Sequence, residues 1–177
     1  METKGDCTMF YHNKLRMLTL TALFAAAITV TTAYLLHIPI PTGGYVHLGD
    51  TLIYLAACLL PVPWAAAAAA IGAGLADLLT APIWVLPTLV VKAVIVLFFT
   101  SRNERILCRR NVIAVFAAGL FSPAAYALAG CVLTGTLASF APQFLGTLVQ
   151  GIGSGALFLA IAPALDSVKL KSRVSIE

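Results

Sequence analysis

The stretch that decides the fold is LLPVPWAAAAAAIGAGLADLLTAPIW, at residues 59–84. Proline lacks a helical N–H and restricts the residue before it, so Pro61 ends one apolar run and Pro82 ends the next. Between them lies an alanine-rich run of the length that a membrane-spanning helix needs. We therefore predict a tight hairpin of two helices, at residues 49–61 and 63–79.

The whole chain has the composition of an integral membrane protein. Of its 177 residues, 60% are hydrophobic and 10% are charged, whereas about a quarter are charged in globular proteins. With ~20 apolar residues for each crossing, the chain has room for about six helices and no separate soluble domain. We expect one all-α membrane domain over residues 1–177, with helices at about 15–36, 49–61, 63–79, 84–100, 111–136 and 141–164.

Basic residues predict the orientation of these helices. Ten of the 11 Lys and Arg residues lie before the first helix, between the fourth and fifth, or after the sixth. The loops on the other side, at residues 37–48, 80–83 and 137–140, contain none. The positive-inside rule makes the basic face cytoplasmic, so we expect a multi-pass plasma-membrane protein with both termini in the cytoplasm.

The eleventh basic residue, Lys92, lies inside the apolar run LPTLVVKAVIVLFF. An ionised amine at this depth needs a carboxylate partner or water, and it is a functional-site hypothesis by default. Asp77, which closes the third predicted helix, is the first candidate, and Asp50, which opens the second, is the other. A structural ion pair and a ligand-facing role are both open for Asp77 and Lys92. Asp50 also fits a helix N-cap.

Four further side chains are candidates for contact with a small molecule. Tyr45 and Trp84 are expected near the outer interface, where aromatic residues either anchor a protein to lipid head groups or stack on a flat ligand. His47 lies in the outer loop and is either solvated or ligand-binding. Gln150 lies midway along the sixth helix, where its amide must bond a neighbouring helix or a ligand.

Other patterns bear on partners and chemistry. Ala22 and Ala26 are four residues apart on the first helix and give it a smooth face for another helix. The chain has no phosphate-binding loop of the type GxxxxGK(S/T), so it does not bind ATP by this motif. Its four cysteines form no CxxC pair and have no histidine at metal-ligand spacing. We expect no metal, no cofactor and no nucleic-acid partner.

The segment PTGGYVHLGDTLIYLAACLLPVPWAAAAAAIGAGLADLLTAPIWVLPTLVVK, at residues 41–92, resembles the substrate-binding S components of energy-coupling factor (ECF) vitamin transporters. The most specific pieces are HLGD before the second helix, ADLL at the end of the third, and PTLVVK in the fourth. The resemblance covers nearly the whole chain. It implies a prokaryotic six-helix bundle that holds one vitamin or precursor in an outward-facing cavity, under a lid between the first two helices.

The resemblance also implies roles for the marked residues. Tyr45, His47 and Asp50 would belong to the lid, and Ala22 and Ala26 would meet a transmembrane coupling subunit that two cytoplasmic ATPases drive. Val30 stands where the family's alanine pattern continues. Asp77, Trp84, Lys92 and Gln150 complete the expected substrate site. The likeness favours a queuosine precursor slightly over a pyridoxine-type vitamin or hydroxymethylpyrimidine.

Two other classes of protein compete with this interpretation. A stand-alone secondary carrier would use Asp77 and Lys92 as a proton or ion relay, although the chain shows no inverted repeat. An intramembrane enzyme would use Ser154 or Asp77. Ser154 has no evident base in the sequence, and we expect no catalytic residues.

Overall fold

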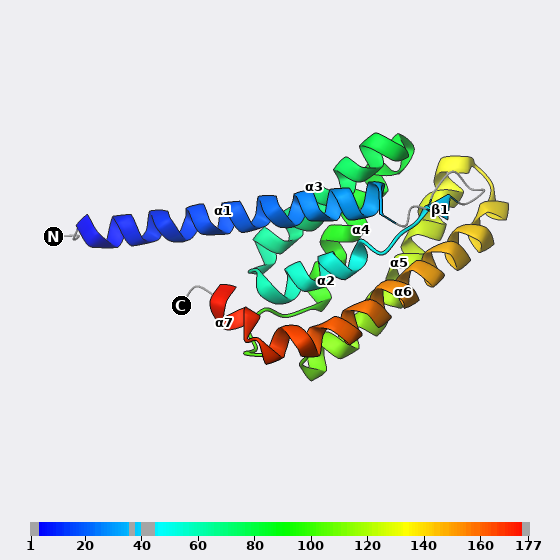
Figure 1. Ribbon diagram of the computed structural model, residues 1–177. Coiled ribbons are helices and arrows are strands. Elements are labelled where there is room, and N and C mark those ends of the chain that lie inside the picture. Colours follow the sequence, from blue (N-terminus) through cyan, green and yellow to red (C-terminus); the bar gives the residue numbers. More distant parts are fainter. Residues whose placement is uncertain (1–3, 36–37, 40–44, 175–177) are drawn as a thin grey trace.

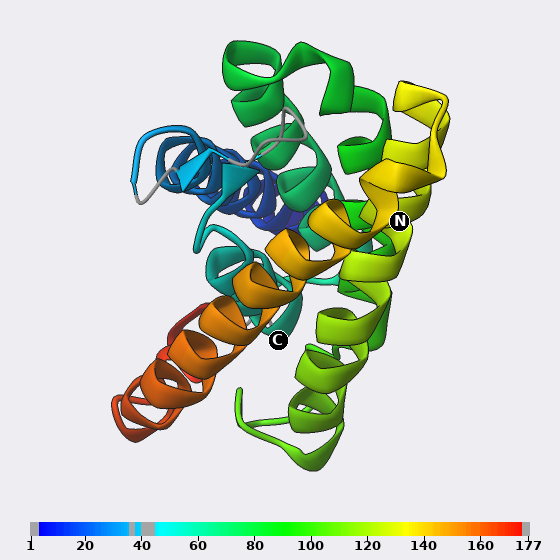
Figure 2. The ribbon, with the colours of Figure 1, turned by 90° about the vertical axis from the view of Figure 1, so that its right-hand side faces the viewer.

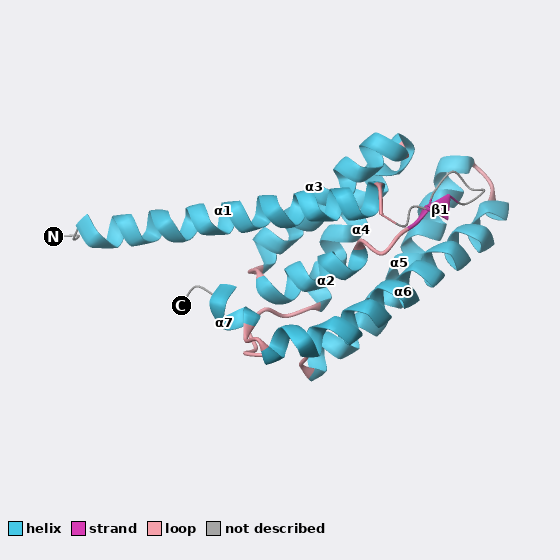
Figure 3. Cartoon of the chain, in the orientation of Figure 1, coloured by secondary structure: helices cyan, strands magenta, loops and turns pink. Residues whose placement is uncertain are grey.

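The computed structural model describes residues 4–35, 38–39 and 45–174, and nearly all of them are helical (Figures 1 and 3). The elements in chain order are α1 (Lys4–Ala33), β1 (Ile38–Pro39), β2 (Tyr45–Val46), α2 (Asp50–Leu59), α3 (Val62–Thr80), η1 (Pro82–Trp84), α4 (Val85–Phe98), α5 (Arg109–Thr134), η2 (Leu137–Ser139), α6 (Phe140–Ser167) and α7 (Leu170–Val174).

The main helices agree with the expected ones, with four differences. Helix α1 begins at Lys4, well before residue 15, and its N-terminal part projects beyond the bundle (Figure 1). The fourth expected helix is divided into a 3₁₀ turn and α4, and the chain ends in the short additional helix α7. The sequence did not predict the two antiparallel strands β1 and β2, which pair Ile38 with Val46 and Pro39 with Tyr45.

Helix α2 is the centre of the bundle. It packs against α1, α3, α4 and α6, and nine of its ten residues are buried. Around it, α1 packs on α3, α3 on α4, α4 on α5, and α5 on α6. Helices α5 and α6 run side by side in Figure 1 and cross at an angle in Figure 2. An element enclosed on all sides has to be apolar, and its polar groups need partners inside the protein.

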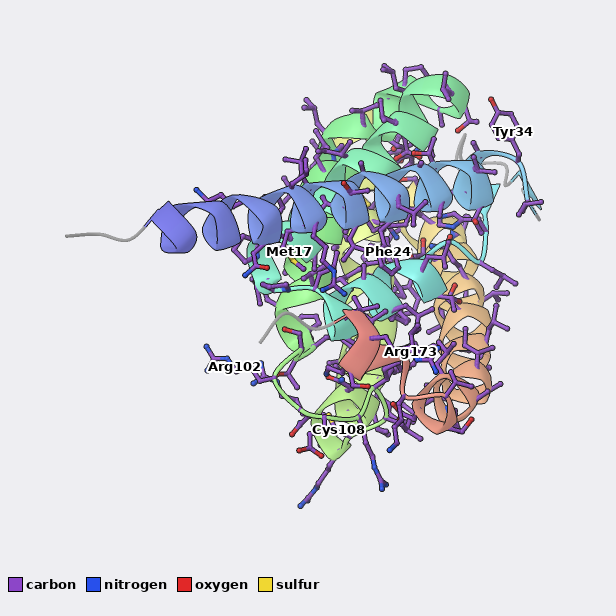
Figure 4. The ribbon with its side chains drawn as sticks, turned by 60° about the vertical axis from the view of Figure 1, so that its left-hand side comes forward. Met17, Phe24, Tyr34, Arg102, Cys108 and Arg173 are labelled. Carbon is purple, nitrogen blue, oxygen red and sulfur yellow. The ribbon has the colours of Figure 1, made fainter. Side chains whose placement is uncertain are left out.

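Glycine allows the close approach of α1 and α3. A Cβ on Gly72 would lie 2.7 Å from the carbonyl oxygen of Ala25 and 2.9 Å from Cβ of Ile28. Thr29 in α1 donates to the carbonyl oxygen of Gly72 at 2.8 Å. Met17 and Phe24 also point from α1 into the bundle (Figure 4).

Four helices are long and apolar enough to cross a membrane, by length and composition. These spans are Asn13–Ala33, Val62–Thr80, Arg109–Thr134 and Leu137–Ser167. Two further apolar helical segments, Asp50–Leu59 and Pro82–Phe98, are shorter.

Polar side chains tie together the end of the bundle that carries residues 99–108 and α7. We call it the basic end, and Arg102, Cys108 and Arg173 mark it in Figure 4. The Asp166 carboxylate accepts the N–H groups of Ile106 and Leu107 at 2.7 and 2.9 Å, which fastens the α4–α5 connection to the end of α6.

Asn111 makes a second tie at the basic end. Its amide nitrogen donates to the carbonyl oxygens of Thr100 and Ile106 at 3.1 and 2.9 Å, and its Oδ1 accepts the N–H of Thr100 at 2.8 Å. Lys171 lies nearby in α7, and its Nζ is buried with no hydrogen-bond partner among the described residues. Burial lowers the pKa of Lys171, while Cys58, Cys108 and Asp166 act in the opposite direction.

Candidate functional site

The core of the site is an ion pair inside the bundle. Lys92 Nζ in α4 lies 2.6 Å from Oδ1 of Asp50, the first residue of α2, and both side chains are at most 2% exposed. Gln150 in α6 donates from Nε2 to the other carboxylate oxygen, Oδ2, at 2.9 Å. Three helices distant in sequence therefore converge on one carboxylate.

The contacts of the pair offset the cost of burying it. Removing two charges from water costs several kcal/mol for each ion, and the cost is recovered only where geometry and additional hydrogen bonds are good. Here both carboxylate oxygens have a donor. The ammonium also lies 5.3 Å from the centroid of the Tyr126 ring, a cation–π distance.

The sequence offered two carboxylates for Lys92, with Asp77 first. The structure pairs Lys92 with Asp50 instead. Asp50 is the first residue of α2, and its side chain makes no N-cap hydrogen bond, because Gly49 occupies the N-cap position. The physical reason is the central position of α2, which brings its first residue within reach of both α4 and α6.

A small polar cavity adjoins the pair. Its volume is about 30 Å³, which suits water molecules rather than a vitamin. The lining residues come from the segment before α2 and from α3, η1, α4, α5 and α6, and they are His47, Asp77, Trp84, Thr88, Tyr126, Gln143, Thr147 and Gln150. Gln150 thus belongs both to the cavity wall and to the carboxylate of Asp50.

Several hydrogen bonds and ring contacts set the side chains of this wall. The hydroxyl groups of Thr88 and Tyr126 lie 2.7 Å apart. The Trp84 and Tyr126 rings are tilted by 54° with centroids 6.0 Å apart. His47 Nδ1 accepts the N–H of Gly49 at 2.9 Å. The indole N–H of Trp84 is buried and has no acceptor among the described residues. The wall therefore offers both aromatic faces and hydrogen-bonding groups.

Of the expected site residues, His47, Asp77, Trp84 and Gln150 line the cavity. Asp50 and Lys92 adjoin it through Gln150. Tyr45 lies in β2, but its side chain is outside what the structure describes. Residues 40–44, which were expected to form part of a lid, also lie outside the described residues.

The sequence interpretation missed four lining residues. Gln143, Thr147 and Gln150 are spaced by four and three residues on α6, the spacing of one helical face, and this pattern was a usable signal. Thr88 precedes Lys92 by one helical turn in PTLVVK, which was a second signal. Nothing in the sequence marked Tyr126.

The small-residue face of α1 lies away from this site. Ala22 and Ala26 are exposed, together with Leu15, Leu18, Leu23 and Val30. Ala25 and Ile28, on the opposite face of the helix, are buried against α3. Ala22 and Ala26 therefore do not pack the described bundle, and another helix could contact them.

The sequence model of the ECF-type riboflavin transporter S component family matches residues 12–167, which include the ion pair, the cavity and the exposed face of α1. The chain belongs to this family. The S component is a membrane transport protein with apolar helices, and its family is a transporter family rather than an enzyme family.

One curated protein is similar in sequence to this chain. It is a protein of Pyrococcus woesei, described as "Uncharacterized protein in gap 3'region". The two chains are 35% identical over 130 residues, which cover 71% of this chain and 85% of the relative.

Proposed function

We propose that this S component is the substrate-binding subunit of an ECF-type importer and takes up a small, uncharged heterocycle. The observation that carries the proposal is the polar cavity inside an apolar bundle, next to a buried ion pair in which both carboxylate oxygens have a hydrogen-bond donor. A lining with a few convergent polar groups among aromatic rings is typical of small-molecule sites, and a cavity of about 30 Å³ would have to widen to admit the ligand.

For this transport role, we propose that the protein lies in the plasma membrane of a prokaryote. In this arrangement the four long spans and the two shorter helical segments would together make six crossings. Both termini and the basic end are then cytoplasmic, by the positive-inside rule. The segment between α1 and α2 faces outward and acts as the lid, with Tyr45, His47 and Asp50 at its end.

The lining of the cavity supports one class of ligand. None of the described cavity-lining residues is Lys or Arg, and the charge of Lys92 is paired with Asp50. A phosphorylated ligand would therefore bring an anion next to Asp77, with His47 the one described lining residue that can carry a positive charge to receive it. Trp84 and Tyr126 offer ring faces, and Gln143 and the indole N–H of Trp84 offer hydrogen bonds to the edge of a heterocycle.

Within this class, we place a 7-deazaguanine precursor of queuosine first. The sequence resemblance favours it, and a bicyclic ligand needs less expansion of a 30 Å³ cavity than the larger riboflavin does. Riboflavin, which the family's description names, is the principal competitor. Pyridoxine-type vitamins and hydroxymethylpyrimidine complete the candidate ligands.

The proposed partners are a transmembrane coupling subunit and two cytoplasmic ATPases. The exposed Ala22 and Ala26 support a helix contact on α1, because small side chains let helix backbones approach closely in a membrane. This face and the ligand cavity are separate, so binding and coupling should be separable by substitution.

The first test measures ligand binding by the purified chain. The protein has two tryptophans, so Trp64→Phe leaves Trp84 as a fluorescence reporter in the cavity wall. We expect one of the four candidate ligands to change this fluorescence and to bind by calorimetry. If that ligand is riboflavin, a pyridoxine-type vitamin or hydroxymethylpyrimidine, we expect its phosphate ester to bind far more weakly. Absence of binding by all four would refute the proposed class of substrate.

The second test measures uptake in cells. Ala22→Leu with Ala26→Leu should abolish uptake while ligand affinity is unchanged, because the larger side chains would separate α1 from the helix of the coupling subunit. Ala160→Leu is the control, since Ala160 is an exposed alanine on α6. Uptake at the normal rate in cells without coupling subunits would favour the stand-alone carrier that relays ions through Asp77 and Lys92.

A further inference from the structure

A groove lies on the outer surface of the bundle, between the end of α4 and the beginning of α5, away from the ligand cavity. Its volume is about 510 Å³, and its apolar wall consists of Phe98, Ile113, Ala114 and Ala117. Phe98 is held edge-on against Phe121, with ring centroids 5.5 Å apart. The wall of the groove is therefore supported by packing within the bundle.

Two arginines close one end of the groove. Arg109 and Arg110 line it, are the first residues of α5, and are exposed. Arg110 Nε donates to the carbonyl oxygen of Phe98 at 3.4 Å, which places its side chain over the end of α4. The groove thus has an apolar length along α5 and a cationic end.

Neither guanidinium is neutralised in the part of the chain that the structure describes. No ion pair joins Arg109 or Arg110 to a carboxylate among those residues. The nearby Asp166 already accepts two backbone N–H groups. The N-terminus of α5 adds positive potential of its own. The end of the groove is therefore suited to an anion.

We propose that this groove binds an anionic phospholipid from the cytoplasmic leaflet. The lipid phosphate would contact Arg109 and Arg110, because guanidinium groups match phosphate geometry. One acyl chain would follow Ile113 and Ala117 into the membrane. The inference rests on the proposed orientation, in which the basic end is cytoplasmic, but not on the identity of the transported ligand.

The charge and position of the groove favour a lipid over a protein partner. Basic sites between helices at the cytoplasmic face are known places for anionic head groups. The face proposed for the coupling subunit is on α1, which packs against α3 and α2, whereas the groove is walled by α4 and α5. A lipid can therefore occupy the groove while the coupling face is in use.

The test is native mass spectrometry of the full-length protein with added phosphatidylglycerol or phosphatidylcholine. We expect phosphatidylglycerol to be retained preferentially. Arg109→Gln with Arg110→Gln should weaken its binding by about 25-fold, since each basic residue at an anionic lipid contributes about fivefold. Arg102→Gln with Arg105→Gln removes the same charge from the same connection, outside the groove lining, and should weaken binding less than threefold.

A second variant tests the apolar part of the groove without changing charge. Ala117→Phe fills the groove and should reduce phosphatidylglycerol retention by about tenfold or more, because the acyl chain loses part of its apolar contact with the groove wall. Thermal unfolding of each variant in detergent checks that the bundle is intact.

Three results would overturn the proposal. Equal losses in the two arginine pairs would show a general effect of charge. Equal retention of phosphatidylcholine would show that the groove does not select an anion. Displacement of the lipid by millimolar inorganic phosphate, with no effect of Ala117→Phe, would identify a free-phosphate site. Ligand binding and uptake are measured separately, so none of these results would refute the transport function.

Discussion

The ion pair of Lys92 with Asp50 allows a quantitative test of its role. We consider Lys92→Met, Asp50→Asn and the double variant. Lys92→Met leaves the Asp50 carboxylate, which is 1% exposed, with Gln150 as its hydrogen-bond donor among the described residues. Asp50→Asn leaves an ammonium that is 2% exposed without a carboxylate. Removing one partner of a buried pair costs about 3–5 kcal/mol, because the other charge stays buried.

The double variant should recover most of this loss. With both charges removed, the amide introduced at position 50 still offers an oxygen to Gln150, and the methionine side chain fills much of the volume of the lysine stem. Replacing a buried pair by uncharged groups is often neutral, so we expect a net cost of about 1 kcal/mol. The coupling energy between the two sites is then several kcal/mol.

The assay is reversible unfolding of the purified protein in mixed detergent, with ligand binding measured on the same samples. If the pair is structural, the double variant should unfold near the wild type and bind ligand within about tenfold, a difference of ~1.4 kcal/mol. Additive losses in the double variant would refute the reasoning, because they would show that neither charge depends on the other. A stable double variant that no longer binds would instead place the pair in contact with the ligand.

Three further predictions concern packing and the basic end. In thermal unfolding, Gly72→Ala should destabilise the protein by about 2–3 kcal/mol, since the new Cβ would meet the Ala25 backbone. The control is Gly119→Ala, whose new Cβ would have nothing within 4 Å, and it should be neutral or stabilising by up to ~1 kcal/mol. Asn111→Leu should cost about 2–4 kcal/mol in the same assay, because it removes hydrogen bonds and leaves buried backbone groups without partners; a loss below ~0.5 kcal/mol would contradict this. Folding lowers the pKa of Lys171, so the folded state holds the proton of this lysine less well than the unfolded state does, and the free energy of unfolding should rise with pH between that lowered pKa and the unfolded value of 10.5. Lys171→Met should flatten this rise and stabilise the protein at neutral pH by up to about 1 kcal/mol. A pH profile of Lys171→Met that matches the wild type would exclude the effect.

The sequence predicted the helices well because prolines and apolar runs mark them directly. Pro61 and Pro82 do delimit α3, and the helix bounds differ by a few residues except at the start of α1. Local patterns cannot show that the ten-residue helix α2 lies in the middle of the bundle. That position depends on which helices pack together, which is a tertiary property.

The difference between local patterns and tertiary packing also explains which site residues could be predicted from the sequence. Lys92 was found because a charge in an apolar run is costly wherever it lies. Its partner could not be chosen from the sequence, because Asp50 and Asp77 are both at helix ends and the decision depends on the crossing of α2, α4 and α6. Tyr126 was missed because a tyrosine in an apolar helix has no local feature that separates a cavity wall from lipid contact.

The small volume of the cavity has a consequence for how affinity and selectivity can change. A ligand larger than a few waters binds only the fraction of molecules in which the 30 Å³ cavity has widened, so every measured dissociation constant is the intrinsic one divided by that fraction. A substitution outside the wall that raises the widened fraction tenfold should tighten all ligands tenfold, and should leave their order of preference unchanged. Changes of preference should come from the wall itself, from residues such as Trp84 and Gln143. Affinity and choice of ligand can therefore be altered independently in this bundle.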